Sequence, residues 1–307
     1  MAVIKVDQLT KDYGNNKGVF DVSFEIEKGE TFGFLGPNGA GKTTTIRHIL
    51  GFSKPQKGST WVSNINSWEK PELIQKDLGY WPGEIAFPEG MTGMRLFKMI
   101  ADLRGMKDLG KADYLIKKFQ LDPGGLVKKM SKGMKQKTAI VAAFMNDPQI
   151  LVLDEPSTGL DPLMQDTFIE LILEEKTAGK TILLSSHMFE EVEVTCDRIA
   201  LIKQGKILTT VAPRDIKFAD KKTYKIEFNS RDDYERMSRE ALNFVEINAK
   251  KNQVKVSVKD ENINEFFRIL TGYDLKYMSE IKTTLRDYFM KYYGRNNGVG
   301  MDAGGAQ

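Results

Sequence analysis

Hydrophobic and polar positions divide the first part of the chain into strand-like and helix-like segments. β-branched and apolar residues alternate or cluster over residues 2–9 and 19–27, on either side of the turn sequence YGNNKG. This pattern predicts an antiparallel pair of strands. The short apolar segment TFGFLG predicts a buried strand, and GPNGAGKTTTIRHILG predicts a glycine-rich loop that opens into a helix ending at Gly51.

The periodicity becomes mainly helical between residues 71 and 144. Glycine and proline residues divide this region into helix-like segments at 93–103, 112–119 and 131–144. After it the two patterns alternate, with strands expected at 150–153, 181–184, 198–203 and 206–210 and helices at 163–176 and 188–194. Strands that alternate with helices favour a parallel α/β core, and we expect a helical insert within it at about 85–145.

A second cycle of elements starts at Lys221 and has a different order. Its pattern predicts strand, helix, strand, strand, helix and strand, followed by one further helix over 281–293. This β-α-β-β-α-β order is typical of a ferredoxin-like fold. We therefore expect an α/β domain over 1–216 and a small α+β domain over 217–293, and the glycine-rich tail 294–307 is predicted to be disordered.

Composition and charge narrow the classes of protein that the chain can represent. The length of 307 residues, with 41% hydrophobic and 28% charged residues, is typical of a globular protein with one large and one smaller domain. A net charge of +3 does not favour a dedicated nucleic-acid-binding protein. The one cysteine, Cys196, excludes an internal disulfide. No apolar run approaches the roughly 18 residues that span a bilayer, and the N-terminus lacks the pattern of a secretory signal, so we expect a cytoplasmic protein.

The sequence GPNGAGKTT matches the pattern G-x-x-x-x-G-K-[ST] of a phosphate-binding loop, or P-loop. It follows a predicted strand and opens a predicted helix, as that loop requires. Glycines allow successive backbone N–H groups to turn towards phosphates, and the helix N-terminus adds the positive end of its dipole. We expect Lys42 to reach the β- and γ-phosphates of ATP and the Thr43 hydroxyl to coordinate Mg²⁺. The expected nucleotide-binding residues of this loop are Gly36, Pro37, Asn38, Gly39, Ala40, Gly41, Lys42, Thr43 and Thr44.

The apolar segment ILVLDEP carries two adjacent carboxylates near its end, Asp154 and Glu155. Taken alone, this pattern also fits a buried strand that meets a polar turn. With the phosphate-binding loop upstream, we expect Asp154 to hold Mg²⁺ through a coordinated water and Glu155 to deprotonate the attacking water as general base. The two neighbouring side chains would then divide metal binding and base catalysis between them.

The order of these segments, together with SKGMKQK, STGLDP and LLSSH, resembles the nucleotide-binding domain of ABC (ATP-binding cassette) transporters over about residues 2–215. The resemblance implies an ABC ATPase core of the P-loop NTPase class, with an antiparallel β subdomain and a helical insert. SKGMKQ resembles the family's signature, which implies that Ser131, Gly133 and the helix N-terminus bind the γ-phosphate of ATP held by a second copy. Lys132 and Met134 replace a Gly and a Gln of the common signature.

Three further residues gain expected roles from the resemblance. Asp161 in STGLD lies in the segment that communicates between the two nucleotide sites, and it is also a candidate cap for the helix that begins at Pro162. His187 in LLSSH matches the histidine that contacts the γ-phosphate and helps to hold the attacking water. Tyr13 matches the aromatic residue that stacks on adenine, which implies some tolerance for GTP. His48, inside the helix after the phosphate-binding loop, receives no functional role.

One feature of the family is missing from the chain. The family carries a glutamine that senses Mg²⁺ in the segment that is LGYWPGEIAFP here, and this segment has Gly83 followed by Glu84 instead. Our hypothesis is that Glu84 takes over metal coupling or signal transmission. Trp81 and Phe87 are candidates for contact with a membrane-spanning partner, or equally for the core.

The resemblance implies that two copies enclose two ATP molecules and drive a separate transmembrane permease from the cytoplasmic side of a bacterial cell membrane. The Gly83–Glu84 variant and the added domain resemble ATPases that export bacitracin, lantibiotics or toxin peptides, so we expect an exporter of peptides, antibiotics or other amphipathic compounds. The alternative is an ABC ATPase without a permease that acts on nucleic acid or ribosomes. A regulatory module that never hydrolyses ATP is disfavoured by Glu155 and His187. The added domain could reinforce the dimer, hold a regulator or dock on the permease.

Overall fold

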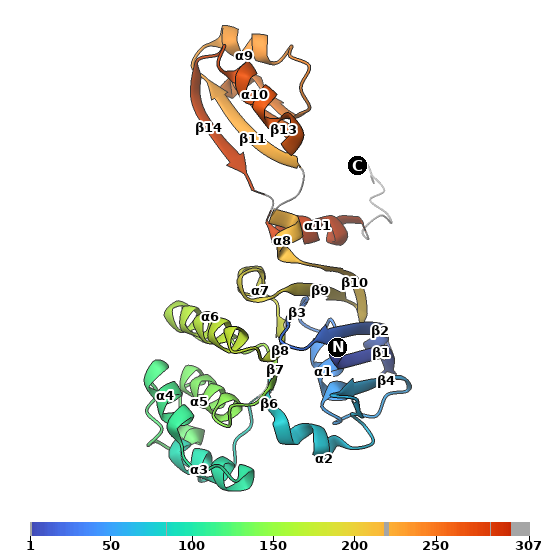
Figure 1. Ribbon diagram of the computed structural model, residues 1–307, viewed down its shortest axis with the longest axis vertical. Coiled ribbons are helices and arrows are strands. Elements are labelled where there is room, and N and C mark those ends of the chain that lie inside the picture. Colours follow the sequence, from blue (N-terminus) through green and yellow to red (C-terminus); the bar gives the residue numbers. More distant parts are fainter. Residues whose placement is uncertain (1, 84, 218–220, 283, 296–307) are drawn as a thin grey trace, which may run out of the picture. The chain divides into compact units, whose positions relative to one another are not determined.

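The residues that the computed structural model describes are 2–83, 85–217, 221–282 and 284–295. They form two compact units that divide between Pro213 and Arg214 (Figure 1). This division falls at the start of the short helix α8 (Pro213–Lys217). Each unit contains its own cluster of buried hydrophobic residues.

A four-stranded antiparallel sheet in the first unit contains the predicted strand pair. Its order is β2-β1-β4-β5, and its strands are β1 (Ala2–Asp12), β2 (Gly18–Glu27), β4 (Lys57–Val62) and β5 (Ile65–Asn66). Alternation along β1 buries Ile4 and Val6, which join the core of the unit. The prediction of an antiparallel pair is therefore confirmed, but β4 and β5 were not predicted.

The second sheet of the first unit has six strands in the order β10-β9-β3-β8-β7-β6. They are β3 (Thr31–Leu35), β6 (Leu78–Trp81), β7 (Ile150–Asp154), β8 (Thr181–Ser186), β9 (Arg198–Lys203) and β10 (Lys206–Val211). All neighbouring pairs are parallel except β9 and β10, which are antiparallel. Every residue of β3, β7 and β8 is buried, as is usual for the inner strands of a parallel sheet. The predicted parallel α/β core is confirmed.

Most of the helices of the first unit lie between the strands of this sheet in the sequence. They are α1 (Lys42–Ile49), α6 (Pro162–Thr177) and α7 (Phe189–Thr195), with α2 (Pro71–Ile74) and the 3-10 turn η1 (Gln75–Asp77) before β6. The helical insert between β6 and β7 comprises α3 (Gly93–Arg104), α4 (Gly110–Lys118), the 3-10 turn η2 (Val127–Lys129) and α5 (Lys132–Phe144) (Figure 1). Among the described residues, no helix combines the length and the apolar character needed to cross a membrane.

Strand β6 lies inside the segment 71–144, where the sequence pattern predicted mainly helix. Four residues are too few to display the period of a strand, and parallel pairing with β7 gives them this conformation. Trp81, the last residue of β6, has no exposed surface. Of the two alternatives given for Trp81, this burial supports the core. Phe87 is half-buried.

The second unit contains a four-stranded antiparallel sheet in the order β12-β13-β11-β14. Its elements in chain order are β11 (Lys221–Phe228), α9 (Arg231–Met237), β12 (Phe244–Asn248), η3 (Ala249–Lys251), β13 (Gln253–Lys259), η4 (Asp260–Asn262), α10 (Ile263–Leu270) and β14 (Leu275–Ile281). Ile226 and Val256 from the sheet share one core with Phe266 of α10. The unit has the predicted order of strands and helices, and its classification as ferredoxin-like stays a prediction.

Helix α11 (Leu285–Arg295) follows β14. The sequence pattern started this helix at Ile281, but Ile281 belongs to β14 and pairs with Thr223 of β11. The tail that was predicted to be disordered overlaps the last two residues of α11, and its remainder, 296–307, lies outside the described residues.

A cluster of charged side chains around the buried Lys180 and Glu175 ties α4 to the core of the first unit. Lys180 is 3% exposed, and its Nζ pairs with Asp147 Oδ1 at 2.5 Å and with Glu175 of α6. Glu175 is 2% exposed and also accepts a hydrogen bond of 2.7 Å from Lys111 Nζ of α4. Lys180 and Glu175 therefore compensate each other's charge where water has almost no access.

The substitution Lys180→Met is expected to destabilise the first unit by about 3–5 kcal/mol, because it removes one partner of a buried ion pair. Unfolding in urea followed by tryptophan fluorescence reports on this unit, since all tryptophans of the chain lie in it. The matched control Lys128→Met removes an exposed pair with Glu89 and should cost less than about 1 kcal/mol. Equal losses for the two variants would contradict a special role of the buried pair.

Candidate functional site

The phosphate-binding loop lies between β3 and α1 and lines a cavity of about 380 Å³. The cavity is lined by residues 38–44 of the loop, by Glu155, and by Tyr13 and residues 16–18 of the turn between β1 and β2. Gly41 has a φ of 109°, and a Cβ at this position would lie 2.8 Å from Val19 Cγ1. Only glycine fits this conformation and this space without strain. The loop therefore presents its backbone to the cavity, as phosphate binding requires.

Lys42 folds back over the loop that carries it. Its side chain is 5% exposed, and Nζ donates hydrogen bonds to the carbonyl oxygens of Gly36 at 2.6 Å and Pro37 at 3.2 Å. The same Nζ forms an ion pair with Glu155 Oε1 at 2.9 Å. Lys42 thus lies at the cavity wall with an anionic oxygen already as its partner.

Glu155 follows β7 and is held in place by neighbours from several segments. Its φ is 52°, an uncommon conformation for a residue other than glycine. Its backbone N–H donates to the Ser185 carbonyl oxygen of β8 at 3.1 Å. Its Oε2 contacts His187 Nδ1 and accepts a hydrogen bond of 3.2 Å from Thr158 Oγ1. The structure therefore brings together the predicted residues Lys42, Glu155 and His187.

Asp154, the last residue of β7, is fully buried. Its Oδ1 accepts a hydrogen bond of 2.5 Å from Ser185 Oγ, while no described residue donates a hydrogen bond to its Oδ2. A Cβ at Gly83 would lie 3.2 Å from this Oδ2. A buried carboxylate oxygen without a donor fits a cation or a cation-bound water. With the Thr43 hydroxyl at the start of α1, these residues fit Mg²⁺, which prefers one or two carboxylates plus water and phosphate.

Tyr13 forms a wall of the cavity from outside the phosphate-binding loop. It is 56% exposed, and its backbone N–H donates to the Lys17 carbonyl oxygen at 2.8 Å, which closes the turn. An exposed aromatic ring beside a phosphate-binding loop is suited to stacking on a base. Asn16 and Lys17 of the same turn also line the cavity and were not predicted. In the sequence, the one indication of this position was that both residues follow Tyr13 within the same turn.

Ser131, Gly133 and Asp161 are not among the described residues that line this cavity. Ser131 caps α5, with its Oγ accepting a hydrogen bond of 3.2 Å from the Met134 N–H. Asp161 caps α6, with Oδ1 accepting from the Met164 N–H at 3.0 Å. The helix cap expected of Asp161 is present, Ser131 caps α5 as well, and neither residue lines the cavity of its own chain.

Two residues of the sequence analysis remain, Glu84 and His48. Glu84, the hypothetical metal-coupling residue, lies outside the described residues. His48 is fully buried, and its Nδ1 lies 2.7 Å from the Thr44 carbonyl oxygen in the preceding turn of α1. Burial lowers the pKa of His48, so this imidazole is neutral at neutral pH.

A buried carboxyl group supports the segment that carries His187 and was not predicted. Glu191 of α7 is 1% exposed, and its Oε2 accepts a hydrogen bond of 2.5 Å from Ser186 Oγ. Ser186 Oγ in turn accepts a hydrogen bond of 3.0 Å from the Met188 N–H. This bond joins the residues directly before and after His187. Burial raises the pKa of Glu191. The sequence FEEVEV is rich in glutamate and looks exposed, so it did not predict that Glu191 is buried.

Comparisons with known proteins agree with this geometry. Residues 19–158 match the family model described as ABC transporter. The chain is 33% identical over 228 residues to Nod factor export ATP-binding protein I of Rhizobium etli, an alignment that covers 70% of each protein. It is 29% identical over 300 residues to bacitracin transport ATP-binding protein BcrA of Bacillus licheniformis, covering 95% of this chain and 97% of that protein. The second alignment extends into the second unit.

A solved structure also has this fold. It is described as the dimeric structure of a post-hydrolysis state of an ATP-binding cassette bound to ADP and Pi, with a TM-score of 0.62. It is 22% identical to this chain and covers 69% of this chain and 99% of that chain. The predicted ABC ATPase core is therefore confirmed. The chain belongs to the ABC transporter family, and it is an ATP-binding cassette that hydrolyses ATP.

Proposed function

We propose that this chain is the ATP-hydrolysing subunit of an exporter, in which two copies close around two ATP molecules and drive a separate membrane permease. The observation that carries the catalytic part is the contact of Glu155 with both Lys42 and His187 at the edge of the phosphate-binding cavity. A carboxylate held between a cation and an imidazole, beside a loop suited to phosphates, has the surroundings of a general base.

The ion pair between Lys42 and Glu155 gives each of these residues a role in the reaction. Phosphate oxygens in the cavity would compete with Glu155 for Lys42, because both are anionic oxygens. Once released, the Glu155 carboxylate stays in contact with His187 and Thr158 and can accept a proton from water. The water oxygen then attacks the γ-phosphorus, and the bond to the bridging oxygen of ADP breaks. We assign to His187 the orientation of Glu155 and of this water.

The other residues of the site bind rather than react. Tyr13 stacks on the adenine in this proposal, and residues 36–44 hold the phosphates. Mg²⁺ would neutralise charge on the β- and γ-phosphates. We assign Asp154 and Thr43 to hold it, on the basis of the donor-free Asp154 Oδ2.

We propose a dimer because three expected nucleotide-binding residues do not line the cavity of their own chain. Ser131 and Gly133 lie at the exposed start of α5, and Asp161 is exposed at the start of α6. A helix N-terminus with a serine cap is suited to phosphate, yet these residues do not line their own chain's cavity. We propose that they complete the cavity of a second copy. The dimeric description of the similar cassette structure supports this arrangement.

The transport role is supported by the relatives. The alignment with bacitracin transport ATP-binding protein BcrA covers almost all of both chains, and the Rhizobium relative is described as a Nod factor export protein. We therefore propose peptides, antibiotics or other amphipathic compounds as cargo, moved outwards by a permease on another polypeptide. Neither of these relatives is described as acting on nucleic acid or ribosomes.

The substitution Glu155→Gln is expected to lower ATP hydrolysis at least about 100-fold, because an amide keeps the shape of the side chain but does not accept the proton. Phosphate release measures the rate, and equilibrium dialysis checks that ATP is still bound. Gel filtration in ATP should show a dimer, since unhydrolysed ATP holds two copies together. The control Glu72→Gln changes an exposed carboxylate of α2 and should behave as wild type. A Glu155→Gln variant with full activity, or one that stays monomeric in ATP, would contradict the proposal.

A permease partner is tested by affinity purification of the tagged chain from gently solubilised membranes of its own cells. We expect a polytopic membrane protein to co-purify in stoichiometric amount, and mass spectrometry would identify it. The control is the same purification from cells that carry the chain without a tag. Recovery of the full chain with ribosomes, with nucleic acid or without any membrane protein would overturn the transport role and leave the ATPase assignment intact.

A further inference from the structure

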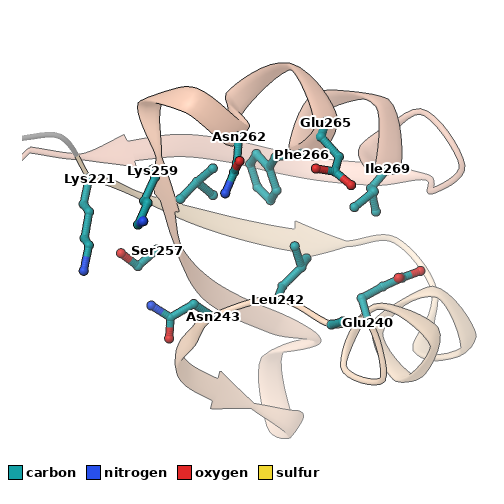
Figure 2. Close-up of a pocket in the computed structure, with 12 residues that line it drawn as sticks. Lys221, Glu240, Leu242, Asn243, Ser257, Lys259, Asn262, Glu265, Phe266 and Ile269 are labelled. Atoms are coloured by element: carbon teal, nitrogen blue, oxygen red, sulfur yellow. The ribbon is translucent and has the colours of Figure 1, made fainter.

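The second unit contains a pocket that the ATPase reaction does not use. Its volume is about 450 Å³, within the range of roughly 300–1,000 Å³ that is typical of small-molecule sites. Figure 2 shows that its walls come from α10, from the segment 240–243 between α9 and β12, and from the end of β13. All of these elements belong to the second unit. The pocket is therefore a property of this unit by itself.

One end of the pocket carries two lysines, and the Nζ of one of them, Lys259, already pairs with the exposed Glu261 Oε1 at 3.1 Å, a partner that a ligand carboxylate would replace. Lys221 at the start of β11 and Lys259 at the end of β13 lie at this end in Figure 2, with Ser257 and Asn243 beside them. The backbone of Asn243 is tied to β13, because its carbonyl oxygen accepts a hydrogen bond of 2.8 Å from the Ser257 N–H. Asn262, which precedes α10, also lines the pocket and lies beside Phe266 in Figure 2. Ammonium and amide groups gathered in this way suit a carboxylate.

The other end of the pocket is anionic. Glu240 and Glu265 line it from two different elements, and Figure 2 shows both away from the lysines. Tyr273 OH donates a hydrogen bond of 2.7 Å to Glu240 Oε1 and so holds this carboxylate. Burial, and then this hydrogen bond, raise the pKa of Tyr273 to about 12, so the phenol remains a donor at neutral pH. Within the described part of the chain, Glu265 forms no ion pair, which leaves it free to bind an ammonium group.

Apolar side chains separate the two charged ends. Phe266 is 2% exposed and belongs to the core of the second unit. Leu242 and Ile269 are half-buried and pack against the same core, so part of each remains open to the pocket. A ligand that spans the pocket would therefore cover apolar surface between its charged groups.

We propose that this pocket binds a small zwitterion with an apolar body. Its carboxylate would meet Lys221 and Lys259, its ammonium group would meet Glu240 and Glu265, and its apolar part would cover Leu242 and Ile269. Free amino acids with large apolar side chains and peptides of two or three residues share this chemistry. The pocket is a binding site distinct from the nucleotide site, and it does not depend on the proposed transport role.

Binding is tested by calorimetry on the full-length chain with L-leucine and with the dipeptide leucyl-leucine. Saturating ADP is added first, so that the probe carboxylate cannot bind at the phosphate-binding loop. We expect at least one probe to bind more tightly than about 1 mM, and the tighter probe identifies the ligand class. N-acetylation or C-terminal amidation of that probe should each weaken binding at least about tenfold, because each removes one charge-assisted hydrogen bond.

Variants locate the site. Glu265→Gln should weaken binding at least about tenfold, and Lys259→Gln should do the same. The matched controls Glu280→Gln and Lys250→Gln change exposed charges of the same unit that do not line the pocket, and they should leave binding unchanged. ADP affinity should stay at the wild-type value in all four variants. Failure of both probes to bind at about 10 mM would overturn the proposal, as would binding that is insensitive to both pocket variants.

Discussion

The ion pair between Lys42 and Glu155 is the interaction on which the site depends. It joins the loop after β3 to the turn after β7, two strands that flank β8 in the sheet. Since the carboxyl ends of parallel strands meet at one edge of a sheet, residues far apart in the sequence converge there. His187, which follows β8, reaches Glu155 from the strand between them. The order of the strands therefore brings Lys42, Glu155 and His187 together.

The surrounding core keeps this arrangement in place. Glu155 adopts a positive φ, a conformation that costs of order 1–3 kcal/mol and persists where the neighbouring structure holds it. The fully buried strands β7 and β8 provide that support, together with the hydrogen bond from the Glu155 N–H to Ser185. Glu191 extends the support to the segment around His187 through Ser186. Strain at Glu155 is thus balanced by apolar burial on the strands behind it.

Much of the fold and the centre of the site could be predicted from the sequence, because short motifs encode local backbone geometry. The phosphate-binding loop, the carboxylate pair after β7 and the histidine after β8 each follow a recognisable strand. Strand β6 could not be predicted, since four residues show no period and only pairing with β7 makes them a strand. Trp81 was uncertain for the same reason, because its burial depends on that pairing.

The contributions of other residues arise only in three dimensions. Lys17 enters the nucleotide cavity because the turn between β1 and β2 folds over the loop, and Glu191 is buried although its sequence looks exposed. The pocket of the second unit joins residues from several elements, and no local pattern connects Lys221 with Glu265. Motifs report the chemistry of one segment, whereas these features depend on contacts between segments.

In the proposed reaction, Lys42 exchanges Glu155 for phosphate when ATP binds. The most direct measurement is an experimental structure of the chain with Mg²⁺ and a non-hydrolysable ATP analogue. We expect Lys42 Nζ to contact the β- and γ-phosphates and Glu155 to be released from it and to face the γ-phosphorus. Ser131 of a second copy should reach the same phosphate. An analogue bound in the cavity while Lys42 remains paired with Glu155 would contradict this exchange.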